Sequence, residues 1–464
     1  MRKIVVTLIL TAFGFISSAQ NTDSLMIRRV ADEILINSKA YDNLRYLTKQ
    51  IGARLAGSPG MVKAEQWGFK TMQESGADKT RLQECMVPRW VRGGRDEAGI
   101  TSFQSTTEGV GKTKSERKLD VTALGNSIGT GPKGIVDNVV LINSFDELEA
   151  KKDQVNGKIV FFNYKFNPAY VNTFQAYREA GQYRTHGPSR AAKYGALAVI
   201  IRSLSGSTDN NPHTGMTDYD SAYAMIPAVA IGLRDADFLS DRLANGKVSV
   251  FIRTNGKFLP DTIGHNVIGE LKGSQFPEEI ITVGGHLDCW DNCEGAHDDG
   301  AGCVQTIEVL RAFKAVGYKP KRTIRFVLFA NEENGLRGGA KYSEEAKAKG
   351  EHHIFALESD AGGFTPRGFG FVVSDDQFKK IMQWQKLIAP FGAADFIRGG
   401  GGADIGPLNK AFGTPLASLN LDSQRYFDIH HARNDVFESV NKRELELGAV
   451  NMAALIYLVD QYGL

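Results

Sequence analysis

The second half of the chain alternates short apolar runs with segments of helical periodicity. Residues 280–283, 323–329 and 354–357 have the length and composition of buried strands, and residues 302–315 and 338–349 have the spacing of helices. Strands that alternate with helices predict an α/β fold, a mostly parallel mixed sheet sandwiched by helices. In such sheets ligands bind at the carboxyl ends of the strands. This end of the predicted sheet is therefore where functional side chains are expected.

The middle of the chain has a different pattern. Between residues 120 and 257, strand-like runs alternate with loops and only short helices, and metal-ligand residue types do not cluster. The runs are 139–142, 158–162, 197–201, 228–231 and 248–252. We interpret residues 120–257 as an inserted, β-rich, non-catalytic domain. The catalytic domain is then expected to be built from residues 20–119 and 258–464, with helices over 24–50 and 62–74.

The N-terminus has the three parts of a signal peptide. Arg2 and Lys3 precede an apolar run over residues 4–16, and the small residues 17–19 follow it. The apolar run is too short to span a bilayer. We expect cleavage after Ala19 and export to the periplasm or the medium, with no membrane attachment of the mature protein. An uncleaved membrane anchor is the alternative interpretation.

Composition and charge indicate which kinds of binding partner the protein is not expected to have. The chain has 464 residues, of which 42% are hydrophobic and 23% charged, as in ordinary soluble globular proteins. Removal of residues 1–19 takes away two basic side chains and no acidic one, so the formal charge falls from +2 to zero. Because no basic stripe is evident, nucleic acid and anionic membranes are not expected partners. The sequence leaves open whether the protein forms a homodimer.

Four cysteines bear on the redox state. Cys85, Cys289, Cys293 and Cys303 are the only ones in the chain. Export permits disulfides, and the C-x3-C spacing of Cys289 and Cys293 would suit a local bridge. Thiolate metal ligation is the weaker alternative, because this pair has no matching second pair.

Histidines and carboxylates follow the ends of the predicted strands. They are His286 and Asp288, then Asp298 and Asp299, then Glu332 and Glu333, then Asp360, and far downstream His430, His431 and Asp435. Burying such groups unpaired costs several kcal/mol, so they need a positive partner. Imidazole and carboxylate without thiolate suit zinc, with cobalt or manganese as substitutes.

The number of candidate ligands predicts more than one ion. Two histidines and three or more carboxylates are too many for one catalytic zinc, but they suit two metals that share a bridging carboxylate. Of Glu332 and Glu333, one can coordinate metal while the other acts as a general base. Asp288 can accept the second imidazole N–H of His286, and Asp435 is a candidate for the same role at His431.

Other polar residues are weaker candidates. We expect structural or solvent-facing roles for His297, His352, His353 and His430, which lack a partner pattern. The glycine run 399–402 permits close backbone approach to a ligand, and Asp404 after it could meet a substrate ammonium group. A free C-terminus would instead need a cation, for which Arg398 and Arg425 are candidates.

At these residues the chain resembles the co-catalytic dizinc aminopeptidase and carboxypeptidase family. The supporting stretches are Gly285-His286-Leu287-Asp288-x-Trp290-Asp291, Asp298-Asp299-Gly300-x-Gly302, Glu332-Glu333, Glu358-Ser359-Asp360-Ala361-Gly362, His430-His431-x-x-x-Asp435 and, upstream, Pro88-x-Trp90-x-Arg92-Gly93. The middle block, with Asn156-Gly157-Lys158-Ile159-Val160 and Ile226-Pro227-Ala228-Val229, resembles the family's protease-associated domain. The Cys289 and Cys293 pair is outside the family pattern.

The resemblance implies a role for each matching residue. It makes Asp298 the bridging ligand of two Zn²⁺ ions, with Glu333 and His431 on one ion and His286 and Asp360 on the other. It also makes Glu332 the general base and Asp288 the acid that orients His286.

The implied function is that of an exported metallo-exopeptidase acting on short peptides or dipeptides. Whether it works as an aminopeptidase, a carboxypeptidase or a dipeptidase stays open. One alternative is a glutaminyl cyclase-like enzyme with a single zinc, and another is a non-catalytic, receptor-like ectodomain on the same scaffold. The complete ligand set and the paired glutamates favour the hydrolase.

Overall fold

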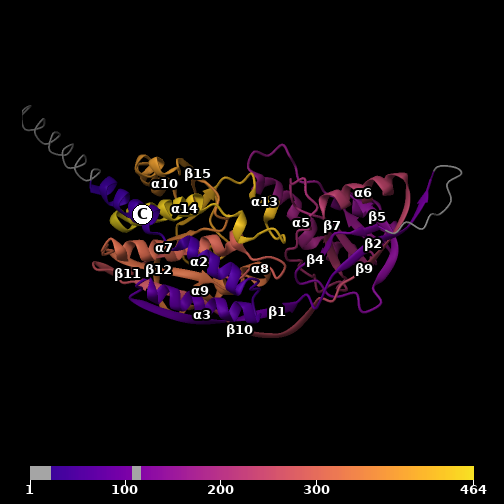
Figure 1. Ribbon diagram of the computed structural model, residues 1–464, viewed down its shortest axis with the longest axis horizontal. Helices are drawn as coiled ribbons and strands as arrows, with labels where there is room; N and C mark the ends of the chain where they lie inside the picture. The colour runs from indigo at the N-terminus through magenta and orange to yellow at the C-terminus, as the bar shows by residue number, and fades with distance from the viewer. Residues whose placement is uncertain (1–21, 107–116) are drawn as a thin grey trace, which may run out of the picture.

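The computed structural model describes residues 22–106 and 117–464, which form two lobes, each built on an eight-stranded sheet (Figure 1). The predicted signal peptide lies outside the described residues. No helix in the described part of the chain is both long and apolar enough to cross a membrane.

The first sheet carries the strands predicted for the catalytic domain. Its order is β1 (Lys79–Val91), β10 (Lys257–Leu271), β12 (Arg322–Phe329), β11 (Phe276–His286), β13 (His352–Glu358), β16 (Leu416–Leu421), β14 (Pro366–Val372) and β15 (Asp395–Arg398). The central strands β12, β11, β13 and β16 are parallel, whereas β1 with β10, β10 with β12, and β14 with β16 are antiparallel. The mixed α/β fold with a parallel centre is confirmed.

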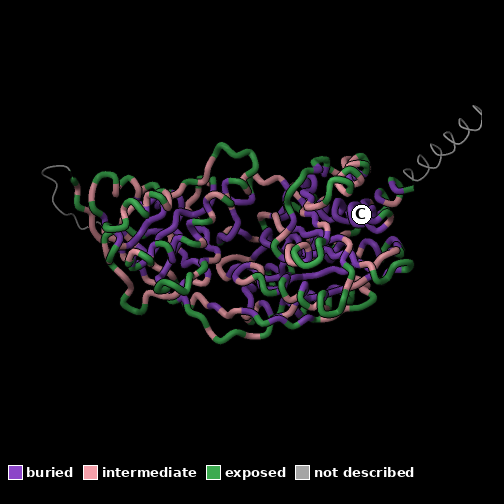
Figure 2. The backbone as a smooth tube through the Cα atoms, turned by 180° about the vertical axis from the view of Figure 1, so that it is seen from behind, coloured by how far each residue is buried: buried purple, intermediate pink, exposed green. Residues whose placement is uncertain are grey.

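Helices cover both faces of this sheet, and successive side chains along a strand point to opposite faces. Along β12, Ile324, Phe326 and Leu328 join the large core, while Val327 and Phe329 join a smaller core on the opposite face. The large core includes α3 (Pro59–Glu74), α7 (Ala301–Ala315) and α14 (Lys442–Tyr462), and the smaller one includes α9 (Arg337–Lys349) and α12 (Gly406–Phe412). Figure 2 shows the buried backbone concentrated between these layers.

The remaining elements of this lobe are the N-terminal helix and several short helices. They are a helix over residues 22–37, α2 (Ala40–Tyr46), η1 (Leu47–Ile51), η3 (Ala296–Gly300), α8 (Glu332–Gly335), α10 (Asp375–Met382), α11 (Gln385–Ile388), η4 (Ala389–Phe391), α13 (Tyr426–Ile429) and η5 (Phe437–Ser439). The helices predicted over 24–50 are confirmed as the helix over residues 22–37, α2 and η1. The helix predicted over 62–74 is confirmed as α3, which starts earlier because Ser58 caps it and Pro59 occupies its first turn.

The second sheet is formed by a segment inserted between β1 and β10. Its order is β3 (Arg117–Leu119), β2 (Glu97–Ser105), β9 (Gly246–Arg253), β5 (Ile135–Ile142), β6 (Ile159–Phe162), β7 (Ala198–Arg202), β8 (Ala228–Ile231) and β4 (Val121–Ala123). Its helices are α4 (Phe145–Ala150), η2 (Lys152–Gln154), α5 (Thr173–Ala192) and α6 (Leu233–Asn245). Two expectations need correction. This sheet begins at β2, before residue 120, and α5 is a long helix of 20 residues.

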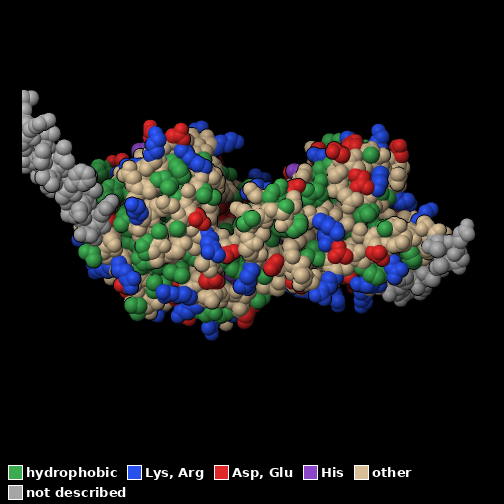
Figure 3. Space-filling view, turned by 90° about the horizontal axis from the view of Figure 1, so that it is seen from above, with side chains coloured by type: hydrophobic (Ala, Val, Ile, Leu, Met, Phe, Trp, Pro, Cys, Tyr) green, Lys and Arg blue, Asp and Glu red, His purple; other side chains and the backbone are tan. Residues whose placement is uncertain are grey.

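The two lobes meet through aromatic rings. Phe174 and Tyr177 of α5 stack on Tyr426 and Phe427 of α13, with ring centroids 5.5 and 4.6 Å apart. In Figure 1, α5 lies beside α13 at the junction of the lobes, and Figure 3 shows the surface hollowed between them.

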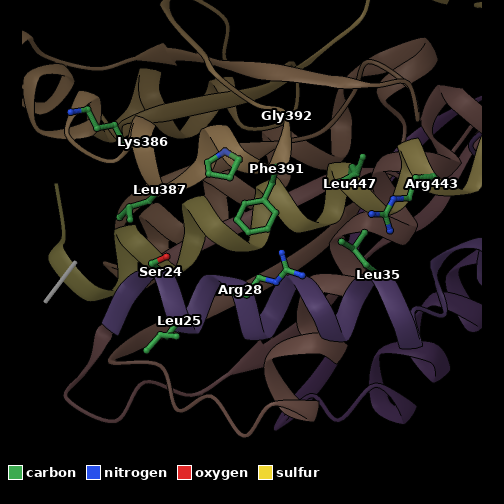
Figure 4. A pocket seen from close by; sticks show the side chains of 11 residues that line it. Ser24, Leu25, Arg28, Leu35, Lys386, Leu387, Phe391, Gly392, Arg443 and Leu447 are labelled. Carbon is green, nitrogen blue, oxygen red and sulfur yellow. The ribbon is translucent and has the colours of Figure 1, made fainter. Parts of the chain in front are cut away.

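A groove of about 660 Å³ lies elsewhere, between the N-terminal helix and α14 (Figure 4). It is lined by Ser24, Leu25, Arg28, Leu35, Lys386, Leu387, Pro390, Phe391, Gly392, Arg443 and Leu447. None of these is a predicted site residue, so this groove is separate from the strand ends.

Candidate metal centre and active site

The parallel strands deliver the predicted ligands to one edge of the first sheet. His286 is the last residue of β11, Glu332 begins α8 three residues after β12, and Asp360 lies two residues after β13. Pairing of β11 with both neighbours aligns their carboxyl ends, since His286 lies opposite Phe329 and Gly284 opposite Glu358. His431 arrives from the loop after α13.

Asp298 lies at the centre of two ligand groups. Its Oδ1 is 3.2 Å from His286 Nε2, which is itself 3.4 Å from Asp360 Oδ1. Its Oδ2 is 3.2 Å from His431 Nε2, which is 3.0 Å from Glu333 Oε2. The structure thus brings all five predicted ligands together around Asp298, and His430 lies with Asp298 and His431 in a second possible ligand group.

These spacings and the donor set fit zinc. Two ligands about 2.0–2.1 Å from a tetrahedral zinc ion lie about 3.3 Å from each other. Asp298 Oδ2 and Glu333 Oε1 are buried and make no hydrogen bond within the described part of the chain. A cation bound among these oxygens would compensate for their burial.

The electrostatics of the site show an excess of negative charge. Burial raises the pKa of Glu333 well above its usual value, and Asp298 adds to the effect. Burial also raises the pKa of Glu332 to about 8, an effect that His286 opposes and Asp360 reinforces. The pKa of Asp298 is different, because the His286 and His431 rings outweigh burial and hold it well below its usual range.

Asp288 supports the site differently from the prediction. His286 Nδ1 lies 3.0 Å from the main-chain oxygen of Asp288, whereas the Asp288 carboxylate is 3.7 Å away. That carboxylate instead accepts the backbone N–H groups of Glu332 and Glu333, at 3.0 and 3.3 Å. The expected orienting bond to His286 therefore comes from the carbonyl, and the carboxylate anchors the two glutamates.

His431 is oriented by the second lobe. Its Nδ1 lies 3.3 Å from the main-chain oxygen of Thr214, so a proton on Nδ1 leaves Nε2 free to face the ligand group. Asp435, the predicted partner, instead accepts the backbone N–H groups of His297 and Asp298, at 2.8 and 3.1 Å. It therefore holds the loop that carries Asp298. The middle block, expected to be non-catalytic, contributes directly to this site.

His430 is closer to the site than the sequence indicated. Its ring stacks on His431 with centroids 3.5 Å apart, and its Nε2 is 3.5 Å from Asp298 Oδ2. Rings of Tyr177, Tyr426 and Phe427 surround it. Its direct adjacency to His431 was the signal that could have found it.

Two other predicted histidines are structural. His297 stacks on Phe364 and accepts the backbone N–H of Gly363, while His353 contacts Thr282 and Glu351 in the opposite layer.

The candidates for substrate termini make contacts of their own within the protein. Asp404 is fully buried beside Glu358, so it lies out of reach of a substrate ammonium group in this structure. The glycine run approaches the protein itself, because a Cβ at Gly402 would lie 2.2 Å from the Glu358 carboxyl carbon. Arg398 is exposed and pairs with Asp375, and Arg425 lies over the Phe364 ring.

The proposed local disulfide is not present. All four cysteines are free thiols, with Cys85, Cys289 and Cys303 buried. Cys303 Sγ donates to the main-chain oxygen of His286, at 2.9 Å, and so packs behind the ligand strand.

The fold and the ligand groups define a zinc metallopeptidase. The chain belongs to peptidase family M28, whose family model matches residues 266–456.

Individual relatives extend the match beyond that segment. Human carboxypeptidase Q is 34% identical over 423 residues, which cover 91% of this chain and 85% of the human protein. A peptidase M28 precursor from Shewanella amazonensis has a crystal structure that superposes with a TM-score of 0.88 at 32% identity, covering 95% of this chain and 97% of that one. The zinc aminopeptidase of Bacillus subtilis, 22% identical over 90% of this chain and 94% of its own, shares the fold with a TM-score of 0.62. The predicted family is confirmed.

Proposed function

We propose that this protein is an exported dizinc exopeptidase that hydrolyses short peptides or dipeptides, with Glu332 as its general base. We further propose that the inserted lobe is a protease-associated domain, bounded by the ribbon of β1 and β10. The observation that carries the catalytic proposal is the position of Asp298, whose two carboxylate oxygens face different histidine and carboxylate pairs.

Each residue has a distinct part in this mechanism. His286 and Asp360 would hold one zinc ion, Glu333 and His431 the other, and Asp298 would bridge them. The bound ions would supply Lewis-acid polarisation of the scissile carbonyl and activation of the attacking water.

Glu332 would take a proton from that water and return it to the leaving amine. Its backbone is fixed for this task by the hydrogen bond to Asp288.

Two alternatives make different predictions. A glutaminyl cyclase-like enzyme would hold one zinc ion, and a receptor-like ectodomain would hold none and hydrolyse nothing. The complete set of five ligands and the relationship to carboxypeptidase Q favour the peptidase. A count of one zinc per chain would revive the first alternative.

Substitution of Glu332 tests the assigned base. Glu332→Gln should keep zinc near two per chain and lower kcat by about 10²–10⁴-fold, because general base catalysis contributes about that factor. Glu344→Gln, at an exposed position on α9, is the matched control and should keep full activity. Dipeptide hydrolysis and metal analysis of the same samples provide the measurement. Substantial turnover by Glu332→Gln would show that another group is the base.

The export proposal has a separate test. Cleavage after Ala19 should leave Gln20 as the first residue of protein recovered outside the cytoplasm, which N-terminal sequencing would show. Recovery of a chain that retains Arg2 and Lys3 would instead support the membrane-anchor alternative.

A further inference from the structure

The groove between the N-terminal helix and α14 combines an apolar lining with basic side chains. Six of its eleven lining residues are apolar and three are basic, and none of those that the structure describes is acidic. Its volume of about 660 Å³ lies within the range of small-molecule sites, about 300–1,000 Å³. Such sites have a mostly apolar wall and a few polar groups that orient the ligand. The lining therefore suits a small ligand with an apolar part and a negative charge.

Arg443 supplies a positive charge without an acidic partner. It forms no ion pair within residues 22–106 and 117–464, whereas Arg28 pairs with Asp32 at 2.9 Å. Glu446, one turn after Arg443 on α14, pairs with Lys442 at 3.7 Å. The cap of α14 uses only the backbone N–H of Arg443, so its guanidinium group remains available to an anion.

The apolar side chains of the groove remain accessible to solvent. Leu25 is 71% exposed, and Leu387, Phe391 and Leu447 are half-buried. A single exposed leucine is ordinary, but a concave group of six apolar residues keeps water against a continuous apolar surface. A ligand with an apolar chain would displace this water and gain the free energy of burial.

The groove is elongated and has a cation at each end. Its lining positions on the N-terminal helix run from Ser24 to Leu35, which is about three turns or about 16 Å. In Figure 4, Arg443 and Leu35 lie at one end of the groove, and Lys386 and Leu387 lie at the other. This shape suits a linear apolar chain with a charged group at its end.

We propose that this groove binds an anionic amphiphile, a monocarboxylate with an unbranched alkyl chain such as a fatty acid. Its carboxylate would contact Arg443, and its chain would lie along Leu25, Leu387 and Phe391. A guanidinium group matches a carboxylate in two parallel hydrogen bonds. The site is independent of the proposed peptidase function, because none of its residues is a proposed metal ligand or base.

The lining favours an alkyl chain over a peptide. Each residue of an extended peptide brings a backbone N–H and C=O group that need hydrogen-bonding partners. Apart from the three cations, Ser24 has the only polar side chain among the lining residues that the structure describes. A methylene chain makes no such demand.

Calorimetric titration of the zinc-loaded protein with octanoate, decanoate and dodecanoate tests the proposal. Burial of the chain predicts that each step of two methylenes tightens binding about 4- to 16-fold. Decanoate should bind about fivefold tighter than decanol, and decyltrimethylammonium should bind more weakly than either, because the groove is positively charged. Affinity that does not depend on chain length, or equal affinity for decanoate and the ammonium compound, would overturn the proposal.

Substitutions locate the two ends of the ligand. Arg443→Met should abolish the preference for decanoate over decanol, whereas Lys118→Met, at an exposed position of the inserted lobe, should keep it. Leu25→Asp should weaken decanoate binding about 10-fold, because it places a carboxylate beside the alkyl chain. Ile36→Asp is the matched control, since Ile36 is on the same helix, is 76% exposed and does not line the groove. Native binding by both Arg443→Met and Leu25→Asp would place the ligand elsewhere and overturn the proposal.

Three further measurements separate this groove from other sites and occupants. Carboxylates also bind zinc, so the titration is repeated after chelation, and loss of binding with the metal would overturn the proposal. In the chelated protein, tighter binding of trileucine than of dodecanoate would identify a peptide site instead. Sedimentation velocity tests for a second copy of the chain. If the native protein dimerises and Leu25→Asp does not, the groove is an interface between copies, and the proposal is wrong.

Discussion

His213 is a buried side chain that should make the free energy of unfolding depend on pH. It is 3% exposed, and burial lowers its pKa from 6.5 to about 4. The unfolded chain, in which the ring has its ordinary pKa, therefore binds a proton between about pH 6.5 and 4 that the folded protein does not bind. The free energy of unfolding should fall with decreasing pH in this window, by at most about 1.4 kcal/mol per pH unit for one group.

Replacement of His213 by leucine tests this coupling. His213→Leu removes the titrating ring, so the free energy of unfolding should lose less between pH 7 and pH 5 than in the native chain. Urea unfolding of both proteins at the two pH values, with a chelator present to keep metal out of the comparison, gives the difference. Equal losses in the two proteins would assign the acid sensitivity to other groups.

The sequence predicted the identities of the site residues better than their contacts. His286, Asp298, Glu333, Asp360 and His431 lie together in the structure. The strand ends predicted that polar residues would meet at this edge, whereas the choice of Glu333 and of His431 came from the family resemblance. The sequence did not show that a main-chain carbonyl would bind His286. Every residue has a main-chain carbonyl, so residue type does not indicate which carbonyl makes a contact. The direction of each carbonyl depends on the path of the loop.

At the scale of elements, the Asp435 side chain holds the first residues of η3 in place. Its carboxylate accepts two buried backbone N–H groups, one of them from Asp298. Asp435→Ala should lower the free energy of unfolding by about 2–4 kcal/mol, since two buried donors lose their acceptor. Zinc affinity should fall by about 10- to 100-fold, as is typical when a group that supports a ligand is lost.

Chemical unfolding and competition with a zinc chelator would measure these two effects. Asp376→Ala, at an exposed position in α10 that pairs only with Lys379 in the described structure, is the control and should leave both unchanged. Native zinc affinity in Asp435→Ala would mean that the loop is held by its other contacts.

Elements with a regular apolar period were predictable, and those fixed by distant partners were not. The predicted strands at 228–231 and 323–329 coincide with β8 and nearly with β12. In contrast, the long ribbon of β1 and β10 pairs residues about 180 positions apart, such as Cys85 with Gly264, which no local pattern reveals. Helix α5 contains Gly181, Gly187 and Pro188, which disfavour a helix locally, but packing of its buried face on the second sheet stabilises it.

At the scale of the whole molecule, the candidate active site is formed by residues of both lobes, which are far apart in the sequence. Thr214 and Arg184 of the inserted lobe reach His431 of the catalytic lobe. Their position depends on how the two lobes pack, because neither lobe alone contains the complete surroundings of His431. The relative placement of the lobes should therefore control catalysis as well as stability.

Phe427 is the residue on which this dependence can be tested. It is 2% exposed, and its ring contacts Phe166, Phe174 and Tyr177 of the inserted lobe, with centroids 5.6, 4.9 and 4.6 Å away. Phe427→Ala should lower the free energy of unfolding by about 3–5 kcal/mol through the cavity it leaves. It should also raise KM for dipeptides, because looser packing of the inserted lobe on α13 would displace Thr214 and Arg184 from His431, a proposed metal ligand.

A core substitution within one lobe separates the two effects. Phe161 is fully buried in the second sheet, so Phe161→Ala should destabilise the protein by a similar amount while KM stays native. Both variants would be assayed at a temperature where each is folded, as judged by its own unfolding curve. If Phe427→Ala kept the native KM, or if Phe161→Ala raised KM equally, stability of the fold rather than the seating of α5 on α13 would control substrate binding.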